Sequence, residues 1–574
     1  MSRAATSEPD SNRGYARNLT EYGDKEFSLF LRRSFAKSLG LTSATTNRPI
    51  IGIAQTWSEL NPCHGHFREL AQAVKRGVLL AGGLPLEFPT MSLGEMFLSP
   101  NAMFYRNLLA METEELLRAQ PLDAVVLLGS CDKNIPAQLM AAASVDVPVI
   151  LLPGGPMLDG YYEGQTLGAC TDCRRLWTEY RAGRLSSSAL DSISDALAPS
   201  VGHCMVMGTA STMACLAETL GMTIPGAAAV PAPMAERYRI AERTGQQAVI
   251  LADQRITPRQ ILTPEAFENA LRVLSAIGGS TNAVIHLTAI AGRVGIRLQP
   301  HDVDRISRAT PLLLALKPSG HFQMSDFSRA GGIPQILKRL QPLLSPQAVR
   351  CSGQSLEQEL NGVRLQEAGE VIATLEKPLA PEGGLAALYG NLAPRGAILK
   401  HAAATPSLLQ HRGRAVVFHS YTELLEDVDH PQCSIQPDDV LVLAGYGPLG
   451  GPGMPELGNL PLPRRLLKKG LCDMVRVSDA RMSGTAFGTV VLHVCPEAEA
   501  GGPLGVIRTG DIIVLDWEHR HVDVLIDDRE LARRMVTARR TTLSHAQRGY
   551  QRLYQQHILQ ADEGCDFDFL RPLS

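Results

Sequence analysis

Three side chains of different chemistry stand side by side in the segment GSCDKNIPA, residues 129–137. Cys131 offers a soft thiolate, Asp132 a hard carboxylate and Lys133 an amine. Thiolates suit zinc and iron–sulfur clusters, whereas carboxylates suit Mg²⁺. The apolar run DAVVLL comes directly before this segment and predicts a buried strand. Two kinds of metal ligand therefore follow the end of one strand.

Cysteines in two other segments have similar surroundings. Cys63 lies in NPCHGH and Cys204 in GHCMVMGTASTM, each in a Gly- or Pro-containing loop beside a strand or helix start. With Cys131 they make three thiols on three loops, an arrangement that can hold an iron–sulfur cluster with one open iron. Buried cysteines without a ligand are also common, so the spacing leaves both interpretations open.

A further pair, Cys170 and Cys173, forms a CxxC in GACTDC. A zinc or redox site of this kind needs more than a lone CxxC, and no second pair follows at ligand spacing. Eleven cysteines in 574 residues are too few for a disulfide scaffold. We therefore expect mostly reduced, buried cysteines and assign the CxxC pair no role.

Carboxylates in two turns can complete a second site around Asp132. Glu95 lies in MSLGEMF and Glu456 in GYGPLGGPGMPELG. Acidic residues in turns are usually solvated, but carboxylates gathered from several loops suit Mg²⁺, which keeps water or substrate in its shell. Lys133 is then either their charge partner or a chemically modified ligand.

Three further segments invite other interpretations. The loop GYGPLGGPGMPE lacks GxxxxGK[ST] and does not fit GxGxxG, so nucleotide binding is not indicated. Ser483, in SDARMSGTAFGT, is either a turn former or a nucleophile or base, but the G-x-S-x-G of a hydrolase elbow is absent. In GGSTNAVIHL, Ser280, Thr281 and Asn282 are expected to cap a buried helix, with His286 in the core.

The elements that position these residues alternate between strand and helix from about residue 48. RPIIGIAQTW, LDAVVLLGSCD and VPVILLPGG predict buried strands, with PLEFPTMSL as a further candidate; FRELAQAVKRGVLLAGG and PAQLMAAASV predict helices. This alternation indicates a parallel sheet with helices on both faces, whose ligands lie beyond the carboxyl ends of the strands. The NPCHGH and GSCDK segments fall at that edge. Residues 185–344 are expected to be mainly helical.

A second domain follows a Pro- and Gly-rich stretch over residues 378–396, which we interpret as a junction. Six strand-like segments come after it, RAVVFHS, DVLVLAG, MVRVSD, TVVLHV, DIIVLD and HVDVLI, and predict a barrel or sandwich. A chain of 574 residues is too long for one core. We therefore predict two domains, over residues 1–380 and 381–574.

Composition excludes several classes of function. A net charge of −3 leaves no electrostatic footprint for nucleic acid or an anionic membrane. No apolar run is long enough to span a bilayer, and the polar lead-in over residues 1–24, expected to be partly mobile, lacks the apolar core of a signal peptide. With 45% hydrophobic residues, we expect a soluble cytoplasmic enzyme acting on a small molecule.

Together these segments resemble the dihydroxy-acid dehydratase/phosphogluconate dehydratase family of hydro-lyases. The resemblance covers residues 48–516 and rests on NPCHGH, GSCDKNIPA, GHCMVMGTASTM, IGGSTNAVIHL, GPLGGPGMPE, SDARMSGT and HVCPEAEAGGP, in that order. It implies an α/β fold, with a parallel-sheet α/β/α N-terminal domain and a C-terminal β-barrel-like domain flanked by helices. It also implies a homodimer or homotetramer.

The resemblance implies two cofactors and a base. A [2Fe–2S] or [4Fe–4S] cluster would lie on Cys63, Cys131 and Cys204, and Mg²⁺ on Glu95, Asp132 and Glu456, with Lys133 carbamylated as a further ligand. The base would be a deprotonated Ser483, with Thr485 close by. An open iron would act as Lewis acid for the 3-hydroxyl, and Mg²⁺ for the carboxylate and the 2-hydroxyl.

Within the family, MSLGE and SDARMSGT are similar to the sugar-acid dehydratases that act on L-arabinonate or D-xylonate, a subgroup associated with [2Fe–2S]. Branched-chain dihydroxy-acid dehydratases carry a GDGI-like segment and TDGRFSGGT instead. GSC and GHC depart from the usual GGC and GAC, next to the cluster ligands but without replacing them. We expect conversion of a 2,3-dihydroxy sugar acid to a 2-keto-3-deoxy acid. The alternatives are a dihydroxy-acid dehydratase of branched-chain amino-acid synthesis and a non-catalytic iron–sulfur sensor.

Overall fold

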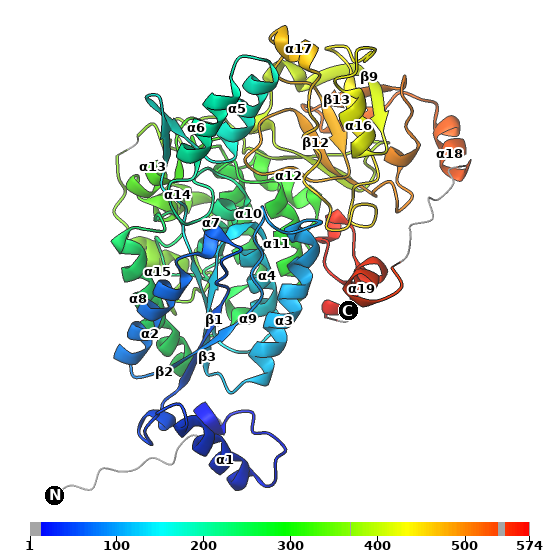
Figure 1. Cartoon of the computed structure of the whole chain (residues 1–574). Helices are drawn as coiled ribbons and strands as arrows, with labels where there is room; N and C mark the ends of the chain where they lie inside the picture. The colour runs from blue at the N-terminus through cyan, green and yellow to red at the C-terminus, as the bar shows by residue number, and fades with distance from the viewer. Residues whose placement is uncertain (1–12, 368, 538–545, 573–574) are drawn as a thin grey trace, which may run out of the picture.

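The computed structural model describes residues 13–367, 369–537 and 546–572 of the chain. An α/β part lies in the lower and central region of Figure 1, and a strand-rich part lies at the upper right. Of the polar lead-in, residues 1–12 lie outside the described residues. Within the rest, Tyr15 is buried, and the backbone N–H of Gly14 donates to Asp123 at 2.9 Å.

The first part is built on a four-stranded, fully parallel sheet of order β2-β1-β3-β4. Its strands are β1 (Ile50–Gln55), β2 (Leu84–Pro89), β3 (Ala124–Gly129) and β4 (Val149–Pro153). Three of them, β1, β3 and β4, are buried along their whole length, as strands with helices on both faces must be. The predicted parallel sheet is confirmed.

Helices cover this sheet and fill the centre of the chain. They are α2 (Phe67–Leu80), α3 (Arg106–Ala119), α4 (Cys131–Ala143), α5 (Thr171–Arg181), α6 (Ser187–Leu197), α7 (Thr209–Thr219), α8 (Ala235–Gln254), α9 (Pro258–Ile261), α10 (Pro264–Ala276), α11 (Asn282–Arg293), α12 (Pro300–Arg308), α13 (Met324–Arg329), α14 (Gly332–Leu340) and α15 (Leu356–Asn361). A small hairpin, β5 (Gly160–Tyr162) and β6 (Gln165–Leu167), precedes α5. The mainly helical middle section is therefore confirmed.

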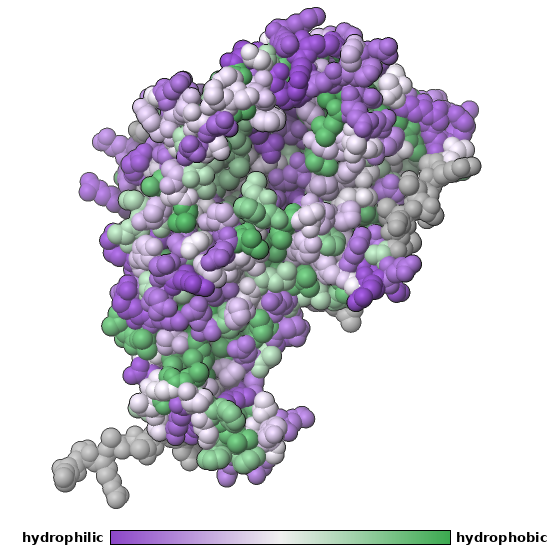
Figure 2. Space-filling view, in the orientation of Figure 1, coloured by the Kyte–Doolittle hydropathy of each residue, from purple (hydrophilic) through white to green (hydrophobic). Residues whose placement is uncertain are grey.

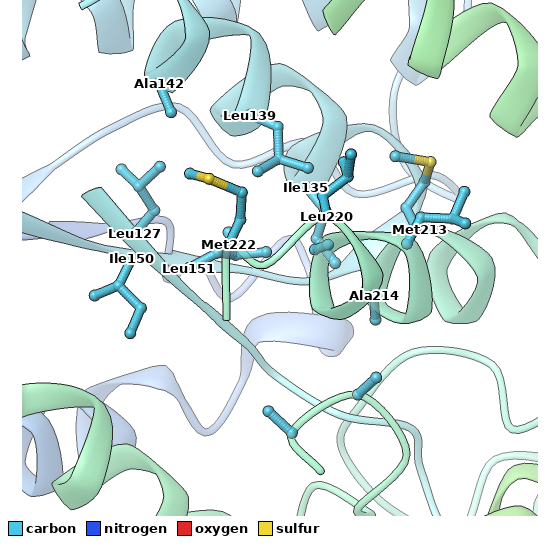
Figure 3. Packing of buried hydrophobic residues seen from close by; sticks show 14 of the residues in the cluster. Leu127, Ile135, Leu139, Ala142, Ile150, Leu151, Met213, Ala214, Leu220 and Met222 are labelled. Carbon is cyan, nitrogen blue, oxygen red and sulfur yellow. The ribbon is translucent and has the colours of Figure 1, made fainter. Parts of the chain in front are cut away.

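Close backbone contact joins α2 to α8. A Cβ atom on Gly77 would lie 1.9 Å from the carbonyl oxygen of Glu242, and one on Gly245 would lie 2.2 Å from that of Val74. Only glycine allows this approach. On the other side of the sheet, Figure 3 shows the apolar core in which β3, β4, α4 and α7 meet, with Leu127, Ile150, Leu139 and Met213 among its members.

The second part is an eight-stranded sheet of order β14-β13-β9-β10-β11-β12-β8-β7. Its strands are β7 (Ala386–Leu388), β8 (Gly396–Leu399), β9 (Gln410–Phe418), β10 (Val440–Leu443), β11 (Arg476–Ser478), β12 (Val490–Cys495), β13 (Ile512–Asp516) and β14 (His521–Val524). Tyr389, directly after β7, pairs with β14: its N–H donates to Arg520 O and its carbonyl accepts from Val522, both at 2.8 Å. The two edge strands therefore nearly close a barrel, as predicted.

Two strands of this barrel were not predicted. β7 and the first residue of β8 fall within the Pro- and Gly-rich stretch that we interpreted as a junction. Their sequences, AAL and GAIL, are short and mostly lack β-branched residues, so the pattern gave no strand signal. The helices of this part are α16 (Tyr421–Asp427), α17 (Arg464–Lys468), α18 (Asp528–Thr537) and α19 (Gly549–His557).

The end of the described chain returns to the α/β part. Arg293 on α11 forms a fully buried ion pair with Asp566, with Nη2–Oδ1 at 3.0 Å. Arg106, at the start of α3, donates to the carbonyl of Cys565 at 2.6 Å. The segment after α19 therefore packs against both α3 and α11.

At the other end, α1 (Lys25–Lys37) projects from the body at the bottom of Figure 1. It exposes Phe27, Phe30 and Phe35, with 46%, 63% and 73% of their surface accessible. Figure 2 shows hydrophobic surface over this helix. A search of the described helices found none with the length and hydropathy needed to cross a bilayer.

Candidate functional site

Three carboxylates from distant parts of the chain meet in the structure. Glu95 lies between β2 and α3, Asp132 in the first turn of α4, and Glu456 in the loop after β10. One oxygen of each lies within 4.8 Å of the others. Oxygen ligands at this separation suit a divalent cation such as Mg²⁺. The α/β part supplies two of these ligands and the barrel part supplies the third.

Lys133 lies between the three carboxylates and is fully buried. Its Nζ is 3.1 Å from Glu95 Oε2, 3.5 Å from Asp132 Oδ2 and 3.7 Å from Glu456 Oε1. Burial opposes a charge on this amine, but the attraction of Glu95 and Asp132 outweighs burial and raises the pKa of Lys133. The ammonium group therefore lies among the three carboxylates and pairs with each of them.

The carboxylates differ in their electrostatic surroundings. Burial raises the pKa of Glu95 to about 7, although Lys133 opposes the shift. Burial raises the pKa of Asp132 as well. For Glu456, burial is outweighed by Lys133 and Arg481, which hold its pKa below the usual value. Ionised, the three acids with Lys133 and Arg481 leave one net negative charge, which favours the binding of a cation.

Two groups that orient Glu456 were missed as functional candidates. The Arg481 guanidinium donates to Glu456 Oε1 at 2.9 Å and to the carbonyl of Met454 at 2.7 Å. The Asn282 amide donates to the same oxygen of Glu456 at 2.7 Å. The expected capping role is therefore wrong for the Asn282 side chain, because α11 begins at this residue and its amide is directed at Glu456. Ser280 does cap, since its Oγ accepts from the backbone N–H of Asn282 at 3.2 Å.

The expected core position of His286 is confirmed. His286 is fully buried on α11, with Nδ1 3.0 Å from Arg106 Nη1. Burial, reinforced by the charge of Arg106, lowers its pKa well below the usual value. His286 is therefore a neutral core side chain.

Ser483 and Thr485 lie in the loop between β11 and β12. Their hydroxyl oxygens are 2.8 Å apart, and both side chains are buried. A Cβ on Gly484 would lie 2.5 Å from Ser280 Oγ, so the loop packs directly on that residue. The Ser280 hydroxyl bonds Thr209 Oγ1 at 2.9 Å, which in turn accepts from the Asn282 amide at 3.0 Å. Short contacts thus connect the serine loop to the group that binds Glu456.

The three predicted cluster cysteines lie near one another. Cys131 begins α4 with a positive φ of 57°, a backbone region that non-glycine residues adopt mainly where the surrounding structure requires it. Its thiol contacts Cys63, and that hydrogen bond together with burial raises the pKa of Cys63 well above its usual value. The Cys204 thiol faces Cys170, with the two sulfurs 3.3 Å apart. The Cys170 thiol also hydrogen-bonds Cys173, so this group of thiols contains two cysteines beyond the three predicted.

A buried histidine connects the segment of Cys63 to the segment that precedes Cys131. His64, next to Cys63, accepts from the backbone N–H of Ser130 through Nε2 at 3.1 Å, and its Nδ1 lies 2.7 Å from the carbonyl of Thr56. Burial lowers the pKa of His64 to about 4, so the ring is neutral and donates from Nδ1. The NPCHGH segment is thereby fixed against the end of β3, where Cys131 and Asp132 follow.

Comparison with known proteins identifies the family. The N-terminal model of the dihydroxy-acid/6-phosphogluconate dehydratases matches residues 48–359, and the C-terminal model matches residues 370–565. The chain belongs to this dehydratase family. Membership makes it an enzyme of the hydro-lyase class.

Named relatives of this dehydratase act on several acids. The L-arabonate dehydratase of Azospirillum brasilense is 49% identical over 558 residues, covering 96% of both chains. The 6-deoxy-6-sulfo-D-gluconate dehydratase of Pseudomonas putida is 44% identical, with 94% of both chains covered. The dihydroxy-acid dehydratase of Moorella thermoacetica is 40% identical, covering 88% of this chain and 91% of its own.

Proposed function

We propose that this dehydratase removes water from a 2,3-dihydroxy sugar acid and releases a 2-keto-3-deoxy acid. Cys131 and Asp132 are adjacent at the start of α4, and this observation carries the proposal. Cys131 lies among the thiols, and Asp132 lies in the carboxylate cluster. A soft metal site and a hard metal site at the same helix end can bind different oxygen atoms of one substrate. The names of two relatives, which specify L-arabonate and sulfogluconate, support a sugar acid.

The donor atoms fit the two groups implied by the family. Cys63, Cys131 and Cys204 would hold a [2Fe–2S] cluster, with [4Fe–4S] as the alternative. Glu95, Asp132 and Glu456 would hold Mg²⁺. Bound there, the two groups supply Lewis acids for the 3-hydroxyl and for the carboxylate with the 2-hydroxyl.

Lys133 is proposed to become a carbamate that adds an oxygen ligand. The three carboxylates keep its amine protonated, whereas reaction with CO₂ needs the neutral amine. A cation in the cluster would remove that attraction by competing for the same carboxylate oxygens. Carbamylation is therefore expected to depend on both Mg²⁺ and CO₂.

Ser483 is proposed to take the proton from C2 of the substrate. A serine hydroxyl is far too weak a base unless its alkoxide is stabilised by a nearby cation or by hydrogen bonds. The Thr485 hydroxyl, at 2.8 Å, can donate to that alkoxide. Thr485 is thus proposed to stabilise the deprotonated form of the base.

The variant Ser483→Ala tests the base. Turnover is expected to fall at least a thousandfold, because no other group would take the proton, while the visible absorption of the cluster persists. Retained turnover would contradict the assignment. Thr485→Val, which removes only the stabilising hydroxyl, is expected to show a smaller loss.

A substrate panel distinguishes the alternatives. Anaerobically reconstituted protein with Mg²⁺ would be assayed on L-arabinonate, D-xylonate, D-gluconate and 2,3-dihydroxyisovalerate. Preference for 2,3-dihydroxyisovalerate would favour branched-chain synthesis, for which the relative at 40% identity is the supporting observation. No turnover of any acid by cluster-containing protein would favour a sensor, although a sensor would not need Ser483.

We also propose a cytoplasmic homodimer or homotetramer with domains over residues 1–380 and 381–574. The exposed phenylalanines of α1 support association, since an apolar face that projects from the body is favourably buried against a second copy.

A further inference from the structure

The first cysteine of the CxxC motif, Cys170, lies beside one of the three predicted cluster ligands. Cys170 Sγ lies 3.3 Å from Cys204 Sγ, and Cys63 contacts Cys131. Cys170 also hydrogen-bonds Cys173, the second cysteine of the motif. Cys63, Cys131, Cys170 and Cys204 thus form two neighbouring pairs, with Cys173 as a further neighbour of Cys170. Three of these four residues were expected to be ligands, and Cys170 was not.

The spacing of the second pair is close to that of two ligands on one metal ion. Two sulfurs on a tetrahedral metal with bonds of about 2.3 Å lie about 3.8 Å apart, and the Cys170–Cys204 distance is within about half an ångström of that value. A [2Fe–2S] cluster with four cysteines has two thiolates on each iron. The two pairs match that pattern.

The backbone conformation of Cys170 and the contacts of its neighbours hold its thiol in place. Cys170 stands directly before α5 with a φ of 73°, a conformation that non-glycine residues adopt mainly where the surrounding structure imposes it. Polar contacts hold its neighbours: the N–H of Gly168 donates to Asp172 at 2.7 Å, and the Thr171 hydroxyl donates to the carbonyl of Thr485 at 2.8 Å. The thiol therefore belongs to a fixed segment that is tied to the serine loop.

We propose that Cys170 is a fourth thiolate ligand of the iron–sulfur cluster and shares one iron with Cys204. The proposal rests on the proposed function, because it presupposes the cluster. Three cysteines would leave one iron open, and Cys170 would fill that position while no substrate is bound. On substrate entry the Cys170 thiolate would leave the iron and the substrate hydroxyl would take its place, a ligand exchange with no change in oxidation state. The Thr171–Thr485 hydrogen bond links this exchange to the loop of Ser483.

Spectroscopy of the substrate-free protein tests the assignment. Wild type, Cys170→Ala and the control Cys472→Ser, which alters an exposed thiol, would be reconstituted anaerobically with ferrous iron and sulfide. Iron content, Mössbauer spectra and the electron paramagnetic resonance of the reduced cluster would be recorded. Wild type and control are expected to show two all-sulfur iron sites, and Cys170→Ala one all-sulfur site and one site with an oxygen or nitrogen ligand. L-arabinonate should move the wild-type spectrum toward that of Cys170→Ala.

Two outcomes separate this proposal from the function on which it rests. Equal iron content and identical spectra in wild type and Cys170→Ala would overturn the role of Cys170 and leave the cluster in place. Wild-type protein that binds no iron and sulfide would overturn both. A Cys170–Cys204 disulfide in the peptide map of cluster-containing protein would also overturn the fourth ligand.

Alkylation of wild-type protein gives a second test that needs no variant. Iodoacetamide would be added anaerobically to cluster-free and cluster-containing protein, followed by peptide mapping. Cys170 is expected to react at least tenfold more slowly when the cluster is present, as Cys131 does, whereas the exposed Cys472 reacts equally in both forms. Equal reaction of Cys170 in both forms would overturn the proposal.

Discussion

Replacing Lys400 by methionine is expected to stabilise the protein, although it removes a buried polar residue. Lys400 follows β8, only 1% of its surface is accessible, and its Nζ donates to the carbonyl of Gly484 at 3.4 Å. In the described part of the chain, no carboxylate pairs with it. Burial lowers the pKa of Lys400 to about 7, against about 10.4 for an exposed lysine.

The magnitude follows from the shift. Because the pKa is lower in the folded state, the unfolded chain binds the proton more tightly, and the cost of folding is largest at low pH. At about 1.4 kcal/mol per pKa unit, burying Lys400 costs about 5 kcal/mol below pH 7. That cost falls to about 2 kcal/mol at pH 9 and disappears above the pKa of the unfolded chain. Losing the hydrogen bond to Gly484 offsets about 1 kcal/mol of the gain.

Thermal unfolding of wild type and Lys400→Met at pH 6 and pH 9 measures this effect. The variant is expected to unfold at a higher temperature at pH 6, and its advantage should shrink by about 3 kcal/mol between the two pH values, or on the order of 2–3 °C for a chain of 574 residues that unfolds cooperatively. Lys468→Met, an exposed position on α17, is the matched control and should show no such trend. A variant less stable than wild type at pH 6, or an advantage that does not shrink, would refute the reasoning.

Three further outcomes are expected. Because burial raises the pKa of Glu95 to about 7, Mg²⁺ must displace a proton from Glu95 below that pH. The affinity for Mg²⁺, measured by calorimetry, should fall up to tenfold for each pH unit below pH 7. An affinity that does not depend on pH would contradict this. Arg293→Met leaves Asp566 buried without its partner and should lower the free energy of unfolding by about 3–5 kcal/mol, measured by thermal unfolding. Adding Asp566→Asn to the same chain should recover part of that loss. Phe30→Ser with Phe35→Ser should lower the mass of the assembly in light scattering if α1 packs on a second copy; an unchanged assembly would contradict that role.

The sequence predicted most of the framework because each strand carries its own apolar signal. Buried β1, β3 and β4 are continuous β-branched and leucine runs, which local patterning reveals. The start of α4 was placed too late, at Pro136 in place of Cys131, because proline favours the first turn of a helix. Here Cys131–Lys133 form that first turn, so the proposed metal ligands lie on the helix and not in a loop before it.

The residues of the candidate site could be named from the sequence, but their surroundings could not. Arg481 and Asn282 act on Glu456 across distances that only the fold creates, and no local pattern reveals such a contact. Cys170 was set aside because a CxxC motif is judged by its own spacing, whereas its thiol partner, Cys204, lies on another segment. Only the three-dimensional arrangement groups sulfurs by proximity rather than by position in the chain.

The division of the carboxylate cluster between the two parts of the chain has a consequence for assembly. Glu95 and Asp132 come from the α/β part and Glu456 from the barrel part, so neither part alone offers a complete set of ligands. A cation bound there would stabilise only the conformation in which the two parts are assembled. At a concentration a hundred times its dissociation constant, such a ligand adds about 2.7 kcal/mol to the stability of that state. The magnesium supply would therefore help to set how firmly the two parts stay together between turnovers.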